Sequence, residues 1–65
     1  MVKRVSLDEM IDNIQEGQIA KATYQYATWY VIMSEGELYY CNRYGEKIKK
    51  AMVSYWNVQA EWELL

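Results

Sequence analysis

Side chains that could carry out acid–base or nucleophilic chemistry are scarce in this sequence. It has no histidine, the side chain most often used as a general base near neutral pH. Cys41 is the only cysteine, and although Arg43 nearby could favour its thiolate, there is no histidine to pair with it. We interpret Cys41 as a half-buried strand residue. A single unpaired thiol also favours a reducing compartment, so we expect the protein in the cytosol.

Two pairs of polar residues have a spacing that can hold a metal ion, Asp8 with Asp12 and Glu9 with Asn13. The members of each pair are four residues apart and would share one face of a helix. We interpret them as the solvated side of an amphipathic helix. The three glycines are isolated from one another, so there is no glycine-rich phosphate loop. These features predict a protein that is not an enzyme and uses no metal or cofactor.

Aromatic rings are the most abundant groups that could bind a ligand. The chain has three tryptophans, seven tyrosines and no phenylalanine, so every ring carries a polar group. Such rings suit half-buried positions, including pockets and interfaces, although ordinary core and sheet positions would also explain them. A planar base could stack on these rings while Lys or Arg contacts its phosphate. The same side chains would serve a protein interface, and composition does not separate the two.

Basic residues are concentrated in one segment, residues 42–50, which contains four of the seven Lys and Arg residues. This segment could give an anion a local positive field. It could equally be a solvated edge strand whose lysines discourage aggregation. The net charge of the chain is −2, which disfavours a protein that grips nucleic acid by bulk charge.

A helix is the first element that the pattern predicts. Ser6 and Glu9 have the spacing of a capping box, and Gly17 supplies a left-handed residue that can end the helix. We therefore expect a helix over residues 7–16. Its apolar residues recur at helical spacing and form one stripe: Leu7, Met10, Ile11 and Ile14.

The rest of the chain is rich in β-forming residues. It predicts strands over residues 19–24, 28–33, 37–41 and 61–65, with Glu35 and Gly36 as a hairpin turn and a fifth strand within residues 47–55. Along the third strand, Leu38 and Tyr40 face one way while Tyr39 and Cys41 face the other, so the helix could cover one face and a second subunit the other. Residues 51–58 are expected to form a short strand or a turn.

The fold class predicted is α+β, with one N-terminal helix packed on an antiparallel sheet of about four to five strands. Residues 1–65 form a single domain, and we expect neither a signal peptide nor a membrane span. A chain this short has a marginal core and lacks disulfides, so it is expected to be a homo-oligomer. In the closing strand, Trp62 and Leu64 alternate with glutamates and are expected to face the core.

Four stretches resemble small phage and prophage proteins of the Thoeris anti-defence type-two-like family. They are "SLDEMIDNIQEG" at residues 6–17, "IAKATY" at residues 19–24, "WYVIMSEGELY" at residues 29–39 and "AEWELL" at residues 60–65. The resemblance implies a compact α+β fold whose first and last strands pair, assembled into an oligomer. Some members sequester cyclic ADP-ribose-type signalling nucleotides, without cleaving them, in pockets between subunits. This sequence departs from the family after "Glu-Gly", where Lys21 alone is basic and Tyr24 replaces a common tryptophan.

The leading hypothesis is therefore a phage-type counter-defence protein that binds and sequesters a small nucleotide signal in the host bacterial cytosol. Its candidate residues are four rings to stack on a base and three cations to meet phosphate: Tyr24, Trp29, Tyr39 and Trp56, with Lys21, Arg43 and Lys49. The alternatives are a small inhibitor that binds a host protein, a binder of single-stranded nucleic acid, which the net acidity makes unlikely, and an accessory phage protein without a ligand.

Overall fold

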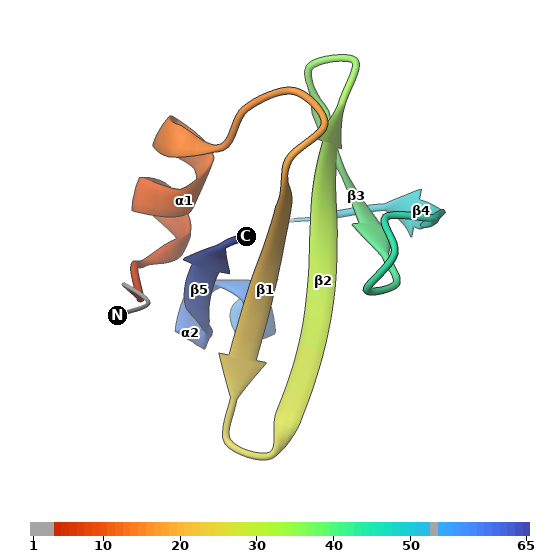
Figure 1. Cartoon of the computed structure of the whole chain (residues 1–65). Helices are drawn as coiled ribbons and strands as arrows, with labels where there is room; N and C mark the ends of the chain where they lie inside the picture. The colour runs from red at the N-terminus through yellow and green to blue at the C-terminus, as the bar shows by residue number, and fades with distance from the viewer. Residues whose placement is uncertain (1–3, 53) are drawn as a thin grey trace.

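The computed structural model describes residues 4–52 and 54–65 of the chain. Its elements are α1 (Leu7–Asn13), β1 (Ile19–Tyr24), β2 (Ala27–Ser34), β3 (Glu37–Cys41), β4 (Lys47–Lys50), α2 (Tyr55–Gln59) and β5 (Glu61–Leu64). The five strands of this part of the chain form one antiparallel sheet in the order β4-β3-β2-β1-β5 (Figure 1). The α+β class and the N-terminal helix are therefore confirmed.

Helix α1 begins where the capping pattern predicts, because the Ser6 hydroxyl accepts a hydrogen bond from the Glu9 backbone N–H at 3.3 Å. The predicted end at Glu16 is wrong. The helix stops at Asn13, and Ile14 is already extended with ψ of 136°. Glu16 lies outside the helix, where its carboxylate accepts hydrogen bonds from the backbone N–H groups of Glu35 and Gly36. The residue that prolongs the helical pattern in the sequence therefore caps a hairpin turn.

The turn between β2 and β3 lies at Glu35 and Gly36, as predicted, and both residues have positive φ, at 54° and 77°. This is the backbone form that two-residue hairpins favour, but it is costly for a residue with a Cβ such as Glu35. The two N–H groups that this turn presents are those bound by Glu16. Gly17 also has a positive φ of 81°, but it lies in a separate turn beyond the end of the helix.

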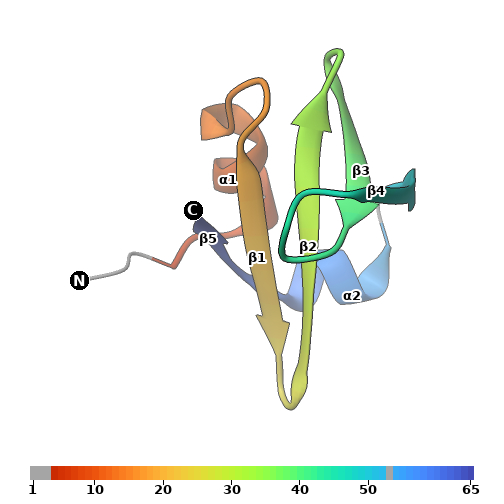
Figure 2. The same cartoon turned by 45° about the vertical axis from the view of Figure 1, so that its right-hand side comes forward.

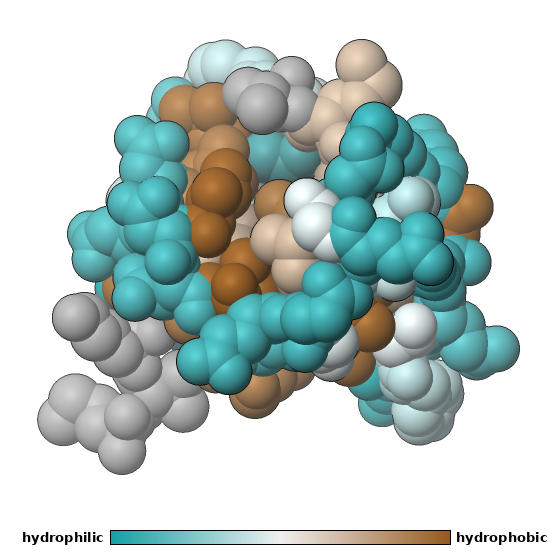
Figure 3. All heavy atoms as spheres, turned by 90° about the horizontal axis from the view of Figure 1, so that it is seen from above, coloured by the Kyte–Doolittle hydropathy of each residue, from teal (hydrophilic) through white to brown (hydrophobic). Residues whose placement is uncertain are grey.

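The core lies between the sheet and the two helices. Its buried apolar residues come from α1 and the residue that follows it, from β1 and β2, and from Ala60 and β5: Leu7, Met10, Ile14, Ala20, Ala22, Val31, Ala60 and Trp62. The expectation that Ile11 belongs to the buried stripe is wrong, since 40% of its surface is exposed. Seen from above, apolar side chains remain visible in a hollow between hydrophilic rims (Figure 3). The core of this small chain is thus incompletely covered at this end.

Strand β5 fastens the end of the chain to its first strand. It pairs with β1 in a register that sets Trp62 opposite Ala22, and Trp62 is 1% exposed. Leu64 is half-buried against the same core. The expectations that β5 pairs with β1 and that its apolar residues face the core are therefore confirmed.

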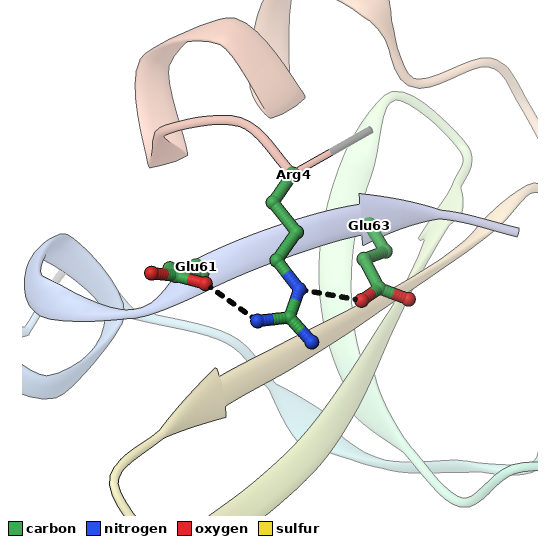
Figure 4. A network of polar contacts seen from close by, with 3 residues as sticks. All are labelled: Arg4, Glu61 and Glu63. Atoms are coloured by element: carbon green, nitrogen blue, oxygen red, sulfur yellow. Dashed lines mark hydrogen bonds and ion pairs between the residues drawn. The ribbon is translucent and has the colours of Figure 1, made fainter. Parts of the chain in front are cut away.

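The N-terminal segment covers the outer edge of β5. Val5 exchanges two backbone hydrogen bonds with Trp62, at 2.8 and 2.9 Å. Beside them the Arg4 guanidinium forms ion pairs with Glu61 at 2.9 Å and Glu63 at 3.0 Å (Figure 4). The hydrogen bonds to Glu61 and Glu63 raise the pKa of Arg4. Because Arg4 is exposed, we assign most of the fastening to the backbone bonds.

Helix α2 replaces the strand or turn expected over residues 51–58, so that expectation is wrong. Ser54 begins it by accepting a hydrogen bond from the Asn57 backbone N–H at 3.3 Å. A helix of five residues is too short to show an apolar period, so its sequence gives little sign of its form. It lies beside the β1–β2 hairpin, toward the lower end of the molecule (Figure 2).

The fifth predicted strand is present, but it is confined to β4 and every residue in it is exposed. The turn before it, residues 42–46, folds back over the face of the sheet opposite the helices. A Cβ placed on Gly45 would lie 3.2 Å from Ile19 Cδ1 and 3.5 Å from Ile32 Cδ1. The chain itself therefore covers part of the sheet face that the sequence left to a second subunit.

Candidate functional site

A pocket of about 660 Å³ opens between the β1–β2 turn and α2. Of the described residues that line it, five are aromatic and none is charged. They come from the hairpin tip, from the middle of the sheet and from the start of α2: Tyr24, Gln25, Tyr26, Ala27, Trp29, Tyr40, Ser54, Trp56 and Asn57. The β1–β2 turn and α2 lie at the same end of the molecule in two views (Figures 1 and 2).

Strand pairing and α2 set the positions of the rings. Tyr24 ends β1, and Trp29 pairs with Ala22 two positions earlier on that strand, so both side chains lie on the core face. The rings of Tyr24 and Trp56 are 5.5 Å apart at an angle of 60°. A hydrogen bond with Tyr55 raises the pKa of the Tyr24 hydroxyl. Trp56 is 58% exposed, so its ring forms an open side of the pocket.

Asn57 is the buried polar residue at the inner wall of the pocket, with 4% of its surface exposed. Its side-chain oxygen accepts a hydrogen bond from Trp29 Nε1 at 2.8 Å. Its side-chain nitrogen donates to the Tyr40 hydroxyl and to the Met52 carbonyl, each at 2.7 Å. Both hydrogens of the amide nitrogen and one lone pair of the amide oxygen are thereby engaged. The amide holds α2 against β2 and β3.

The orientation of this amide follows from the chemistry of its partners. Trp29 Nε1 can only donate, so it must face the amide oxygen of Asn57. The Met52 carbonyl can only accept, so it must face the amide nitrogen. The second hydrogen on that nitrogen is then the one that points at the Tyr40 oxygen. Hence Tyr40 is an acceptor in this bond.

Three of the seven residues expected at a ligand site come together in this pocket. They are Tyr24, Trp29 and Trp56, which approach from two strands and a helix. Lys49 lies beside it, with Nζ 5.9 Å from the centroid of the Tyr40 ring. Lys49 is therefore the cation, among the three expected, that contacts a lining residue.

The other three expected residues lie elsewhere. Tyr39 is on the opposite face of β3 from Tyr40, where the Lys47 ammonium sits 4.9 Å from its ring centroid. Burial raises the pKa of the Tyr39 hydroxyl. Lys21 pairs with Glu63 on the face away from the helices, and Arg43 is exposed in the turn before β4. The structure does not bring these three to the pocket.

Tyr40 and Asn57 are the functional candidates that the sequence did not reveal. The alternation along β3 separated Tyr40 from Tyr39, but it could not say which face carried a pocket. A signal for Asn57 exists in the sequence, because Ser54 stands three residues before it and can cap a helix there. A helix at that position would have turned Asn57 toward the sheet.

A second, more polar hollow of about 360 Å³ shares Tyr24 and Gln25 with the pocket. Arg4 lines it together with Glu61. The charge of Arg4 is already balanced by its two glutamate partners. An anion would therefore gain little there.

The thiol and the carboxylates of the chain are poorly placed for catalysis. Cys41 is 5% exposed, and burial raises the pKa of its thiol, which disfavours a reactive thiolate near neutral pH. Within residues 4–52 and 54–65, no three His, Cys, Asp or Glu side chains gather to hold a metal ion. In the same residues, no helix has the length and apolar character needed to cross a membrane.

Comparison of the chain with known protein families, curated proteins and solved structures finds no match.

Proposed function

We propose that this chain is a non-catalytic binding protein that holds a nucleotide by its planar base. The observation that carries the proposal is the pocket of about 660 Å³, lined by five aromatic residues and no charged one. Its size falls within the usual range for small-molecule sites. Its uncharged, ring-lined surface favours a flat, weakly polar group.

The rings could supply most of the affinity for a base. Stacking on an aromatic side chain contributes about 1–3 kcal/mol per base. Trp56 and Tyr24 meet at 60°, so a base would lie flat on one ring and meet the other with its edge. Lys49, which lies over the Tyr40 ring, is the cation available to a phosphate attached to that base.

Holding a nucleotide without changing it is the activity that fits these groups. The pocket residues include hydroxyls and amides but no carboxylate, thiol or amine that could act as a base or nucleophile. The role as a phage-type counter-defence protein that sequesters a cyclic ADP-ribose-type signal rests on the family resemblance alone. We retain it as the biological setting of the proposal.

Isothermal titration tests the proposal with adenosine, ADP-ribose, cyclic ADP-ribose isomers and cyclic dinucleotides. We expect one of them to bind and to be recovered unchanged by chromatography. Trp56→Ala should weaken binding by roughly five- to a hundredfold, the value of one stacked ring. Tyr44→Ala, which removes a tyrosine that is 78% exposed in a different turn, is the matched control. An absence of heat from every nucleotide at tens of micromolar would refute the proposal.

A cationic ligand should be included in the same titrations. Several rings around one space can also bind a quaternary ammonium group through cation–π attraction. If choline binds, its binding is lost in Trp56→Ala and no nucleotide binds, the ligand of this pocket would be a cation rather than a base.

The surface formed by α2 and Met52 favours a second candidate function. The protein would then be a small inhibitor that binds a host protein. Large apolar side chains stand exposed there: Met52 at 73%, Tyr55 at 62%, Trp56 at 58% and Val58 at 52%. Exposed apolar residues gathered in this way are typical of interaction surfaces. A stoichiometric protein partner in a pull-down from bacterial lysate, together with the failure of all small ligands, would favour this function.

We also propose that the protein is a homo-oligomer. Within the part of the chain that the structure describes, the largest fully buried side chains are Trp62, Met10 and Val31. Oligomerisation commonly stabilises chains of this size. Native mass spectrometry of protein taken directly from cells measures the subunit number and any retained ligand together. A monomer at micromolar concentration would contradict this part of the proposal.

A further inference from the structure

The Tyr40 hydroxyl at the inner wall of the pocket has an assigned acceptor role and an unassigned hydrogen. Its oxygen accepts the second hydrogen of the Asn57 side-chain nitrogen at 2.7 Å, because the first is taken by the Met52 carbonyl. A phenolic hydroxyl also carries one hydrogen to donate. Among the hydrogen bonds of the described residues, the Tyr40 hydroxyl takes part only as this acceptor and donates to no group. Tyr40 and Asn57 both line the pocket, so the hydrogen is available to a ligand.

We propose that Tyr40 is the specificity-determining donor of this pocket and that Asn57 is the positioning residue that makes it a donor. The ligand class that follows is a planar heteroaromatic ring with a hydrogen-bond acceptor, a ring nitrogen or a carbonyl oxygen, on the edge that enters first. This inference deepens the proposed function and rests on it for the use of the pocket by a planar group. It adds that the protein recognises the edge of the planar ring that carries the hydrogen-bond acceptor.

The selectivity arises because the Tyr40 hydroxyl cannot become the donor in its hydrogen bond with Asn57. If the hydroxyl donated to Asn57, the amide would have to present its oxygen to Tyr40, and Trp29 Nε1 would lose its acceptor. A ligand edge with only a donor or only carbon therefore leaves the Tyr40 hydrogen without a partner once water is excluded. Leaving such a group unpaired is costlier than the modest gain from an ordinary hydrogen bond.

Benzimidazole and indole form a matched pair of probes, because they share one bicyclic shape and only benzimidazole has a ring nitrogen that accepts a hydrogen bond. At neutral pH we expect wild-type protein to bind benzimidazole roughly three- to tenfold more tightly than indole, the value of one hydrogen bond. Tyr40→Phe should bind the two equally. Tyr30→Phe is the control, because Tyr30 pairs with Cys41 and Lys21 on the sheet face away from the helices.

Asn57→Asp tests the positioning role by abolishing the preference for benzimidazole while the Tyr40 hydroxyl is kept. A carboxylate only accepts, so the Tyr40 hydroxyl would donate to it and turn a lone pair toward the pocket. The preference for benzimidazole should then disappear, because both probes carry a ring N–H that can donate to this lone pair. The substitution also sets two acceptors face to face at Met52 and costs stability, so ligand binding is measured below the midpoint of thermal unfolding of the variant. A destabilised variant that kept the wild-type preference would show a merely structural role for Asn57.

The outcomes separate this inference from the proposed function. Nucleotide binding that is unchanged in Tyr40→Phe, with equal affinity of wild-type protein for the two probes, overturns the inference and leaves the function standing. A benzimidazole preference that depends on Tyr40, with no nucleotide bound, supports the inference and rejects the nucleotide. No binding of either probe by wild-type protein rejects the pocket as a site for planar groups, and the inference with it.

Discussion

Replacement of Asn57 by alanine tests the central claim about how this fold is held together. The variant loses three hydrogen bonds, to Trp29, Tyr40 and Met52, while the backbone bonds of residue 57 remain. At about 1 kcal/mol for each bond, the free energy of unfolding should fall by on the order of 3 kcal/mol. A chain of 65 residues has a total stability of roughly 3–10 kcal/mol, so this loss is a large share of it.

Urea and thermal unfolding followed by circular dichroism measure this change in protein free of ligand. We expect the melting temperature to fall by roughly 12–24 °C, since each kcal/mol shifts a domain of this size by about 4–8 °C. Gln59→Ala, on an exposed position of the same helix, should change stability by less than about 0.5 kcal/mol. In a double-mutant cycle, Tyr40→Phe should cost less when Asn57 is already alanine. A loss below about 1 kcal/mol for Asn57→Ala would refute the importance of this network.

Three other changes test separate parts of the structure. Gly45→Ala should lower the unfolding free energy in urea by about 1–3 kcal/mol, because its φ is 85° and its new methyl would meet Ile19 at 3.2 Å. Gly17→Ala, with similar φ but open space, should cost less, and an equal cost would exclude the contact with Ile19. A chain ending at Ala60 should show no cooperative thermal transition, because it lacks Trp62 and the strand that pairs with β1, and a sharp melt would contradict this. Burial raises the pKa of the Cys41 thiol above its usual 9.0. The contribution of this thiol to stability is therefore complete below pH 9.0 and is lost as the pH rises through the pKa of the folded state. The melting temperature of Cys41→Ala should fall less steeply with rising alkaline pH than that of the wild type.

Local signals in the sequence were sufficient for most of the fold. The start of α1 depends on Ser6 and its neighbours in the chain, and the β2–β3 turn depends on Gly36 between two β-rich runs. The end of α1 could not be found in this way. Glu16 continues a good helical pattern, but its carboxylate binds the N–H groups of Glu35 and Gly36 in the hairpin turn. A contact across about twenty positions decided the local structure.

The sequence predicted that the candidate site would be lined by aromatic rings, but it identified only some of the residues that line it. The abundance of Tyr and Trp predicted a ring-lined surface, and three of the chosen rings line the pocket. The sequence predicts Tyr39 where the structure has Tyr40, because alternation along β3 assigns the two rings to opposite faces without indicating which face a later element will cover. That element is α2, and its five residues give no periodic signal. The polar residue that organises the pocket, Asn57, was therefore also missed.

The distribution of charge separates a pocket for a base from a surface for nucleic acid. On the sheet face away from the helices, Arg4 is paired with two glutamates and Lys50 is paired with Glu37 at 3.0 Å. The hydrogen bond and the charge of Lys50 lower the pKa of the Glu37 carboxyl. The pocket has no charged lining, and Lys49 is the cation seen beside it. Affinity for a nucleotide should therefore fall only slightly, by the value of one phosphate contact, when salt is raised from 50 to 200 mM, whereas a strand held by 6–10 phosphates would lose about 10³- to 10⁵-fold. Titrations at the two salt concentrations measure this, and a steep loss would mean that the protein grips a phosphate backbone rather than a base.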